Sequence, residues 1–194
     1  MSKKSTTSSK PLQAKILLDT CSYFRLAQSI HPLLGQPFGE QKYALYIHPR
    51  LQAELNKSER LQSKFNWAER EEYRDNRRKI INLASKKEDV EFNFKFIGNY
   101  QVRAGYNLSA EDIYCVATAL SLNIPLVTDD ISLRKVCEDF EVKAFGTIEL
   151  LKLMYDCKYI STDKIIEIKD YLCYMNDWQA NFDDDMKKYF NIDP

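Results

Sequence analysis

Lys15-Ile-Leu-Leu-Asp19 is a short apolar run that ends in aspartate, and Ile124-Pro-Leu-Val-Thr-Asp-Asp130 is a second run of the same kind. Both have the length and the branched side chains of strands buried in a parallel sheet. A third aspartate, Asp112, opens an apolar helix just before the second run. Because the carboxyl ends of parallel strands carry the site in such folds, we expect these aspartates to gather at one edge of the sheet.

The rest of the chain alternates between strand and helix patterns. The alternation of apolar and charged residues from Val90 to Phe96 predicts an edge strand. Further strands are expected at 43–47 and 142–145, and helices from Thr20, from Pro49, twice within 59–87, and at 109–120, 133–140, 148–154, 161–175 and 178–190. This order indicates an α/β fold: a three-layer α/β/α sandwich with a mostly parallel central sheet, plus a C-terminal helical extension.

We divide the chain into three parts. Residues 1–13 are rich in Ser, Thr and Lys and form a flexible N-terminal tail without the apolar segment of a signal peptide. Residues 14–155 form the α/β domain, in which 57–88 is a charged helical arm, and residues 156–194 are the C-terminal helical extension. A chain of 194 residues can bury its core without disulfides or structural metals.

The composition narrows the class of protein. A hydrophobic fraction of 44% with 12 Tyr and 10 Phe argues against disorder. The formal charge is zero, so an anionic partner must be held by a local patch. No apolar run approaches the roughly 18 residues of a membrane span. Five scattered cysteines without CxxC spacing indicate reduced thiols that mostly fill the core. We therefore expect a cytoplasmic protein without membrane contact.

The three aspartates have a fourth candidate partner, Glu54, on the helix after the second strand. Like charges do not gather in a fold unless something offsets their repulsion, and a hard cation such as Mg²⁺ or Mn²⁺ is the usual partner of clustered carboxylates. The chain has 28 acidic residues, so solvated carboxylates and helix caps are the alternative, above all for Asp112.

Four blocks of the sequence resemble the signature motifs of PIN-domain ribonucleases, especially VapC-type toxins. They are Ile16-Leu-Leu-Asp-Thr20, Ala53-Glu-Leu55, Asp112-Ile-Tyr-Cys-Val-Ala-Thr-Ala-Leu120 and Pro125-Leu-Val-Thr-Asp-Asp130. Their order and spacing fit the family over roughly residues 15–150. The third and fourth blocks together are the most specific part.

The resemblance implies an Mg²⁺- or Mn²⁺-dependent ribonuclease that hydrolyses RNA phosphodiester bonds and leaves a 5′-phosphate and a 3′-hydroxyl. The acidic residues would be both catalytic and metal-binding, holding one or two ions: Asp19, Glu54, Asp112 and Asp130. Thr20 and Thr128 would lie beside them, where a hydroxyl can orient a carboxylate or a water.

The remaining residues near the motifs receive other roles. Asp129 is at a position that the family leaves variable, so it is a neighbour and not a ligand. Cys21 stands where Asn or Ser is common, which puts one supporting hydrogen bond in doubt. His31 and His48 both precede proline in loop or turn sequence, and neither is assigned a catalytic role.

The arm is the most basic segment of the chain. Residues 57–88 hold ten lysines and arginines against six acids. Arg74, Arg77 and Arg78 recur at helical spacing and are candidates to bind RNA through its phosphates. The alternative is a solvated helical surface held by ion pairs, or a surface that faces a protein partner. Trp67 is a candidate for the core or for a partner-facing position.

Three functions remain in competition. The leading interpretation is an endoribonuclease that serves as the toxin of a toxin–antitoxin pair, with RNA as substrate and a protein antitoxin or inhibitor as partner. The second is a PIN nuclease in RNA processing or defence without a dedicated antitoxin. The third is a catalytically inactive PIN scaffold or RNA-binding protein, which the intact acidic set disfavours. A homodimer is one option for its assembly.

Overall fold

The computed structural model describes residues 14–177 and 181–192 of the chain. Within these residues a sheet of four strands forms the centre, in the order β2-β1-β3-β4. Every neighbouring pair is parallel, which confirms the predicted parallel sheet. The strands are β1 (Lys15–Leu18), β2 (Ala44–Ile47), β3 (Leu126–Val127) and β4 (Ala144–Phe145).

Helices surround this sheet. In chain order they are α1 (Thr20–Ala27), α2 (Leu51–Lys57), α3 (Glu59–Lys64), α4 (Glu71–Asn76), α5 (Lys87–Arg103), α6 (Ala110–Leu122), α7 (Ile131–Asp139), α8 (Thr147–Asp156), α9 (Thr162–Met175) and α10 (Phe182–Phe190), with a short 3-10 helix η1 (Asn66–Glu69). None of the helices in the described part of the chain is both long and apolar enough to cross a membrane.

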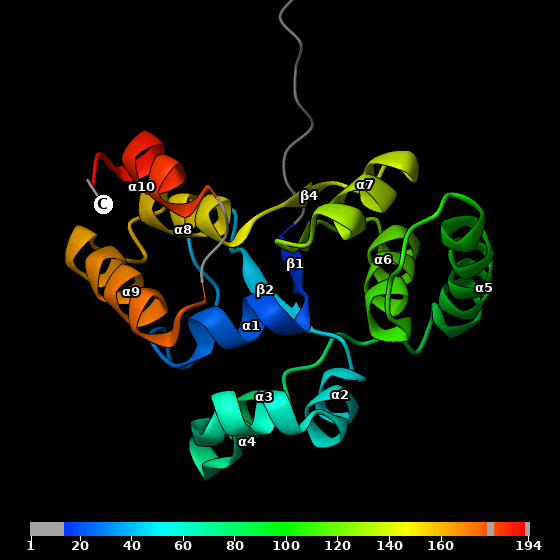
Figure 1. Cartoon of the computed structure of the whole chain (residues 1–194), viewed down its shortest axis with the longest axis horizontal. Helices are drawn as coiled ribbons and strands as arrows, with labels where there is room; N and C mark the ends of the chain where they lie inside the picture. The colour runs from blue at the N-terminus through cyan, green and yellow to red at the C-terminus, as the bar shows by residue number, and fades with distance from the viewer. Residues whose placement is uncertain (1–13, 178–180, 193–194) are drawn as a thin grey trace, which may run out of the picture.

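Both faces of the sheet are buried, because successive side chains of a strand point to opposite sides. Ile16 and Leu18 of β1 belong to one core, which also contains residues of α1, α8, α9 and α10. Leu17, between them, belongs to a second core formed with α5, α6 and α7. The sheet thus lies between two helical layers (Figure 1), and the predicted three-layer α/β/α sandwich is confirmed.

The order of the strands indicates where a ligand-binding site is expected in this sheet. From β1 the chain moves to β2 on one side, and it later returns to add β3 and β4 on the other side. The order therefore reverses between β1 and β3, which lie side by side with Leu17 opposite Leu126. Ligands of parallel sheets bind at such a reversal, outside the carboxyl ends of the strands. Asp19 follows β1 there, and Asp130 follows β3.

Residues 90–96, predicted as an edge strand, lie instead inside α5, so that prediction is wrong. Val90, Ile97 and Gln101 recur at helical spacing and are buried on the side that packs on α6. Phe92 and Phe96 fall on the outer side, where they are 69% and 57% exposed. These two exposed rings gave a helical segment the alternating pattern of a strand.

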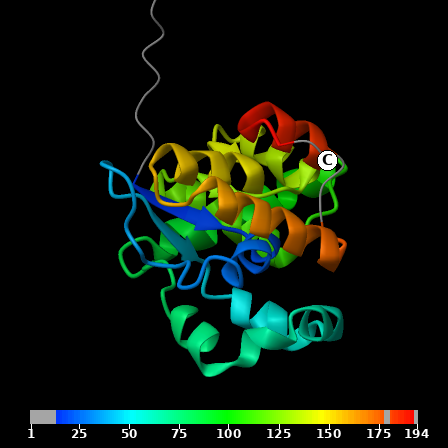
Figure 2. The same cartoon turned by 90° about the vertical axis from the view of Figure 1, so that its left-hand side faces the viewer.

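The arm consists of α3, η1 and α4, and it lies below the sheet in Figures 1 and 2. Two α-helices were expected there, and both are present. The arm packs on α1 through aromatic rings: Phe24 stacks on Phe65 with centroids 4.8 Å apart, and Trp67 lies 6.1 Å from Phe24 and 4.7 Å from Tyr73. Trp67 is buried, so it belongs to the core and not to an exposed anchor for a partner.

Arg77 directly follows α4, and its side chain is only 3% exposed. Its Nε donates to Gln52 at 3.0 Å, one terminal nitrogen donates to the carbonyl oxygen of Ala68, and the other pairs with Glu69 at 2.9 Å. A side chain so placed cannot contact RNA, and the assignment of Arg77 to an RNA-binding surface is therefore wrong. Arg74 and Arg78 are exposed, and their assignment stays a prediction.

Arg77→Ala is expected to lower the free energy of unfolding by about 1.5–3 kcal/mol, the scale of hydrogen bonds made by a charged group. Arg78→Ala is the matched control, because Arg78 is exposed and its one ion pair among the described residues is with Asp75, three residues earlier, at 3.4 Å. It should change the free energy of unfolding by no more than about 0.5 kcal/mol. Urea denaturation of both variants measures the difference, and equal effects would contradict a structural role for Arg77.

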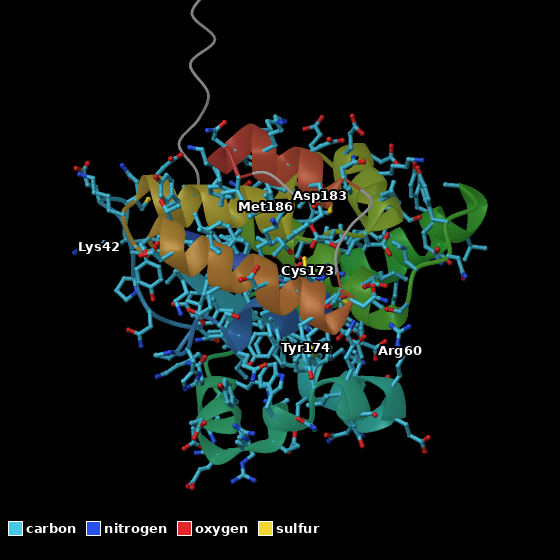
Figure 3. All side chains as sticks on the ribbon, turned by 60° about the vertical axis from the view of Figure 1, so that its left-hand side comes forward. Lys42, Arg60, Cys173, Tyr174, Asp183 and Met186 are labelled. Atoms are coloured by element: carbon cyan, nitrogen blue, oxygen red, sulfur yellow. The ribbon has the colours of Figure 1, made fainter. Side chains whose placement is uncertain are left out.

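The C-terminal extension covers the first face of the sheet. Ile165, Ile168 and Leu172 of α9 are buried, as are Phe182 and Met186 of α10. Figure 3 shows α10 lying over α8 and α9, with Met186 labelled. Trp178, with which the last helix was expected to begin, lies outside the described residues, as does the expected tail at 1–13. Of the cysteines, all free, Cys115 and Cys137 fill the core, whereas Cys21 and Cys173 are exposed.

Candidate active site

A cleft of about 840 Å³ opens at the carboxyl edge of the sheet, next to the reversal of strand order. Its lining includes all four acidic residues selected from the sequence: Asp19, Glu54, Asp112 and Asp130. They come from the end of β1, from α2, from the first turn of α6 and from the end of β3. We call this site the acidic cleft.

Asp19 is the most buried of the four, with 6% of its surface exposed. It ends β1 and caps α1, where its Oδ1 accepts the N–H of Ser22 at 2.6 Å. Burial raises the pKa of Asp19 to about 6, although hydrogen bonds from Thr128 and Ser22 lower it. The carboxylate is thus held in a fixed place where its charge is poorly solvated.

Glu54 reaches the cleft from the middle of α2. The hydroxyl of Thr20 donates to its Oε2 at 2.5 Å, which connects α2 to the residue after Asp19. Burial raises the pKa of Glu54, and the negative charges of Asp112 and Glu111 raise it further. Thr20, expected beside the acidic residues, therefore contacts one of them directly.

Asp112 and Asp130 each hold the start of a helix. The backbone N–H and the hydroxyl of Ser109 donate to Asp112 at 3.1 and 2.7 Å, so the capping role considered for Asp112 is confirmed. Asp130 caps α7 by accepting the N–H of Leu133 at 2.8 Å. The N–H of Asp130 donates to the hydroxyl of Thr128 at 3.2 Å. Both carboxylates cap a helix and also line the cleft.

These carboxylates act on one another. Burial raises the pKa of Asp112, and the charge of Asp130 raises it further. Asp112 in turn raises the pKa of Glu54. The ionised forms of Glu54 and Asp112 are therefore destabilised both by burial and by neighbouring negative charges, and a cation would relieve both effects.

The chemistry of this set fits a cation that prefers oxygen ligands, since the cleft offers carboxylates with the hydroxyl of Thr20 beside them. As the side chains stand, no three His, Cys, Asp or Glu residues among 14–177 and 181–192 are close enough to hold a metal ion. One oxygen of each carboxylate is engaged at a helix start or by Thr20. Side-chain rotation would have to bring the other oxygens together around an ion.

Three solved structures resemble part of this chain. FitAcB from Neisseria gonorrhoeae has a TM-score of 0.46 at 18% identity, covering 68% of this chain and 97% of its own. VapBC-1 from nontypeable Haemophilus influenzae has a TM-score of 0.42 at 19% identity, covering 69% and 98%. VapBC-5 from Mycobacterium tuberculosis, a member of the VapBC family of toxin-antitoxin systems, has a TM-score of 0.38 at 18% identity, covering 69% and 97%.

No family model matches the chain, and no curated protein sequence matches it. Identities this low leave the function to be inferred from the side chains of the cleft.

Asp129, set aside as a neighbour, proves to be the centre of a buried ion network at the back of the cleft. Its side chain is 4% exposed and accepts a hydrogen bond from Arg25 of α1 at 2.6 Å. It also accepts from the N–H of Thr147, at 2.8 Å, and from its hydroxyl, at the start of α8. Arg25 continues to Asp177 at 3.2 Å, and Lys64 of the arm pairs with Asp177 at 3.2 Å. We call these groups the Asp129 network.

The cleft has a further wall that the sequence analysis did not include. Asn181, Asp185, Lys188 and Tyr189, from α10 and the residue before it, line the cleft together with the acidic residues. The Asp183-Asp-Asp185 run forms the first turn of α10. In the sequence, the amphipathic pattern of Phe182, Met186 and Lys188 indicates a helix with one buried side. The pattern does not indicate which part of the domain that helix packs against.

Proposed function

We propose that this protein is a divalent-metal-dependent endoribonuclease of the PIN type, and that it acts as the toxin of a toxin–antitoxin pair. The observation that carries the nuclease proposal is the convergence of four carboxylates, from four distant parts of the chain, on one cleft at the carboxyl edge of the sheet. The sequence blocks around these residues resemble VapC-type toxins, which supports RNA as the substrate and an antitoxin as the partner.

The four carboxylates would hold one or two Mg²⁺ or Mn²⁺ ions through their oxygens. A bound ion supplies Lewis-acid polarisation of a phosphodiester and activation of water. Thr20 fixes Glu54, and Thr128 fixes both Asp19 and the backbone of Asp130. The described residues that line the cleft include no histidine. His48 is buried, and burial lowers its pKa to about 4, so it is neutral and structural.

Incubation of the purified protein with RNA tests the reaction. Cleavage is expected in Mg²⁺ or Mn²⁺ and should stop when EDTA removes the ion. Sequencing of the fragments should find 5′-phosphate and 3′-hydroxyl ends. Cleavage that continues in EDTA, or fragments that end in a 2′,3′-cyclic phosphate, would show a reaction that does not use the carboxylates in this way.

Expression in a host cell tests the toxin role separately. The wild-type protein should arrest growth, co-expression of its antitoxin should relieve the arrest, and Asp112→Asn should be harmless. A protein that cleaves RNA in vitro but leaves growth unaffected would remove the toxin role and leave the nuclease proposal in place.

A further inference from the structure

α10 is held rigidly at the side of the acidic cleft. Phe182 and Met186, one helical turn apart, are 3% and 1% exposed and belong to the core beneath it. Phe190, two turns after Phe182, meets Tyr155 of α8 edge to face with centroids 5.9 Å apart. Asp185 and Lys188, three residues apart, lie on a neighbouring side of the helix and both line the cleft. The backbone of α10, from which the side chains lining the cleft extend, is therefore held in place by packing.

The charge of the cleft is strongly negative. Seven carboxylates of the described residues line it, and only three cations do: Arg25, Arg134 and Lys188. Arg25 is engaged by Asp129 and Asp177. Arg134 donates to the carbonyl oxygen of Thr128 at 2.8 Å and lies 3.7 Å from both Asp129 and Glu149.

Lys188 differs from the two arginines. Its Nζ donates to the hydroxyl of Tyr189 at 3.1 Å and lies 4.5 Å from the centroid of that ring. Among the ion pairs of residues 14–177 and 181–192, it takes part in none. The hydrogen bond to Tyr189 raises the pKa of Lys188, and Asp185 and Glu149 contribute in the same direction, so the side chain stays charged at neutral pH.

We propose that Lys188 binds a backbone phosphate of the RNA strand at the entrance of the acidic cleft, and that Tyr189 positions its ammonium group. This inference rests on the proposed function. A cleft dominated by carboxylates repels a polyanion, and a positive charge in its lining offsets this repulsion. Positive charges that contact the backbone, together with nearby aromatic side chains, are the combination with which proteins hold single-stranded nucleic acid without reading its sequence.

The test measures binding of a short, fluorescently labelled single-stranded RNA of mixed sequence in Mg²⁺, across a series of salt concentrations. All variants carry Asp112→Asn to prevent cleavage. Lys188→Ala should weaken binding several-fold at low salt and reduce the slope of log affinity against log salt by about 0.7, the value for one phosphate contact. Lys188→Arg should restore both quantities. Tyr189→Phe, which loses the hydroxyl, should weaken binding without changing the slope.

Lys187→Ala is the matched control, because it removes the same charge from the same helix at an exposed residue outside the described lining of the cleft. It should leave affinity and slope unchanged. Equal salt slopes for Lys188→Ala and its parent would overturn the phosphate contact while leaving the nuclease proposal intact. Tighter binding by Lys188→Ala would overturn it too, and would mean that α10 obstructs the cleft. If the parent binds no RNA at all, the proposed function fails as well.

Discussion

Asp19→Asn is expected to lower the rate of RNA cleavage at least about 100-fold, the scale of one preorganised group acting on a transition state. Asn caps a helix as well as Asp does, so the hydrogen bond from Ser22 and the start of α1 should survive. What the change removes is the negative charge at the most buried of the four acidic residues selected from the sequence. Gel-based cleavage assays in Mg²⁺ measure the rate, and circular dichroism reports whether the fold is intact.

Asp156→Asn is the control for that experiment, since Asp156 is an exposed carboxylate that pairs with Lys152 on the surface of α8. Its cleavage rate should equal that of the wild type. If Asp19→Asn cleaves as fast as Asp156→Asn, the acidic cleft is not the active site.

Asp19→Asn also measures how much the burial of the ionised Asp19 lowers the free energy of unfolding when no metal is bound. The folded protein binds a proton at Asp19 more tightly than the unfolded chain does, because burial raises the pKa from 3.8 to about 6. In EDTA, the wild type should therefore lose stability relative to Asp19→Asn as the pH rises from about 4 to about 6, by up to about 3 kcal/mol. Urea denaturation at both ends of this range measures the loss. A difference that does not depend on pH would contradict the raised pKa.

Asp129→Ala is expected to lower the free energy of unfolding by about 3–5 kcal/mol, the usual result of removing one partner from a buried ion pair. Arg25 would keep only Asp177 as an ion partner, and the start of α8 would lose both hydrogen bonds from Thr147. Asp75→Ala is the control, because Asp75 is half exposed and pairs with the exposed Arg78. It should cost no more than about 1 kcal/mol.

Urea unfolding, followed by circular dichroism, compares these two variants with the wild type. Similar small losses for both would mean that the Asp129 network contributes little to stability. In that case Asp129 would have to be reconsidered as a residue that acts in the cleft.

Much of the fold could be predicted from local patterns in the sequence. Ile16-Leu-Leu18 of β1 and Leu126-Val127 of β3 are apolar because both sides of their strands are buried there, and such runs stand out in a sequence. Ser109 and Asp112 predict the start of α6, because a capping box is made by residues three positions apart. The convergence of Asp19, Asp112 and Asp130 on one cleft could be predicted for the same reason, since strand ends and helix starts fix where these three carboxylates are.

Other features depend on tertiary packing that a sequence does not display. The segment at 90–96 alternates like a strand, yet α6 offers a surface on which only one side of a helix can pack. Arg77 has the spacing of a solvent-facing arginine, but Gln52, Ala68 and Glu69 surround it from outside its own helix. The wall made by α10 depends on how a helix at the end of the chain docks against α8.

The position of Asp177 determines how far the C-terminal extension can be removed without loss of its ion pairs to the rest of the domain. Asp177 follows α9 in the C-terminal extension, yet it is held by Arg25 from the first helix and by Lys64 from the arm. Ion pairs therefore attach the extension to the domain, in addition to the buried apolar side chains of its helices. Truncation of the whole extension would remove both kinds of contact. A chain that stops before residue 177 would lose the ion partner that Arg25 and Lys64 share. One that stops directly after it would keep that junction and lose α10, and with α10 the proposed phosphate contact of Lys188.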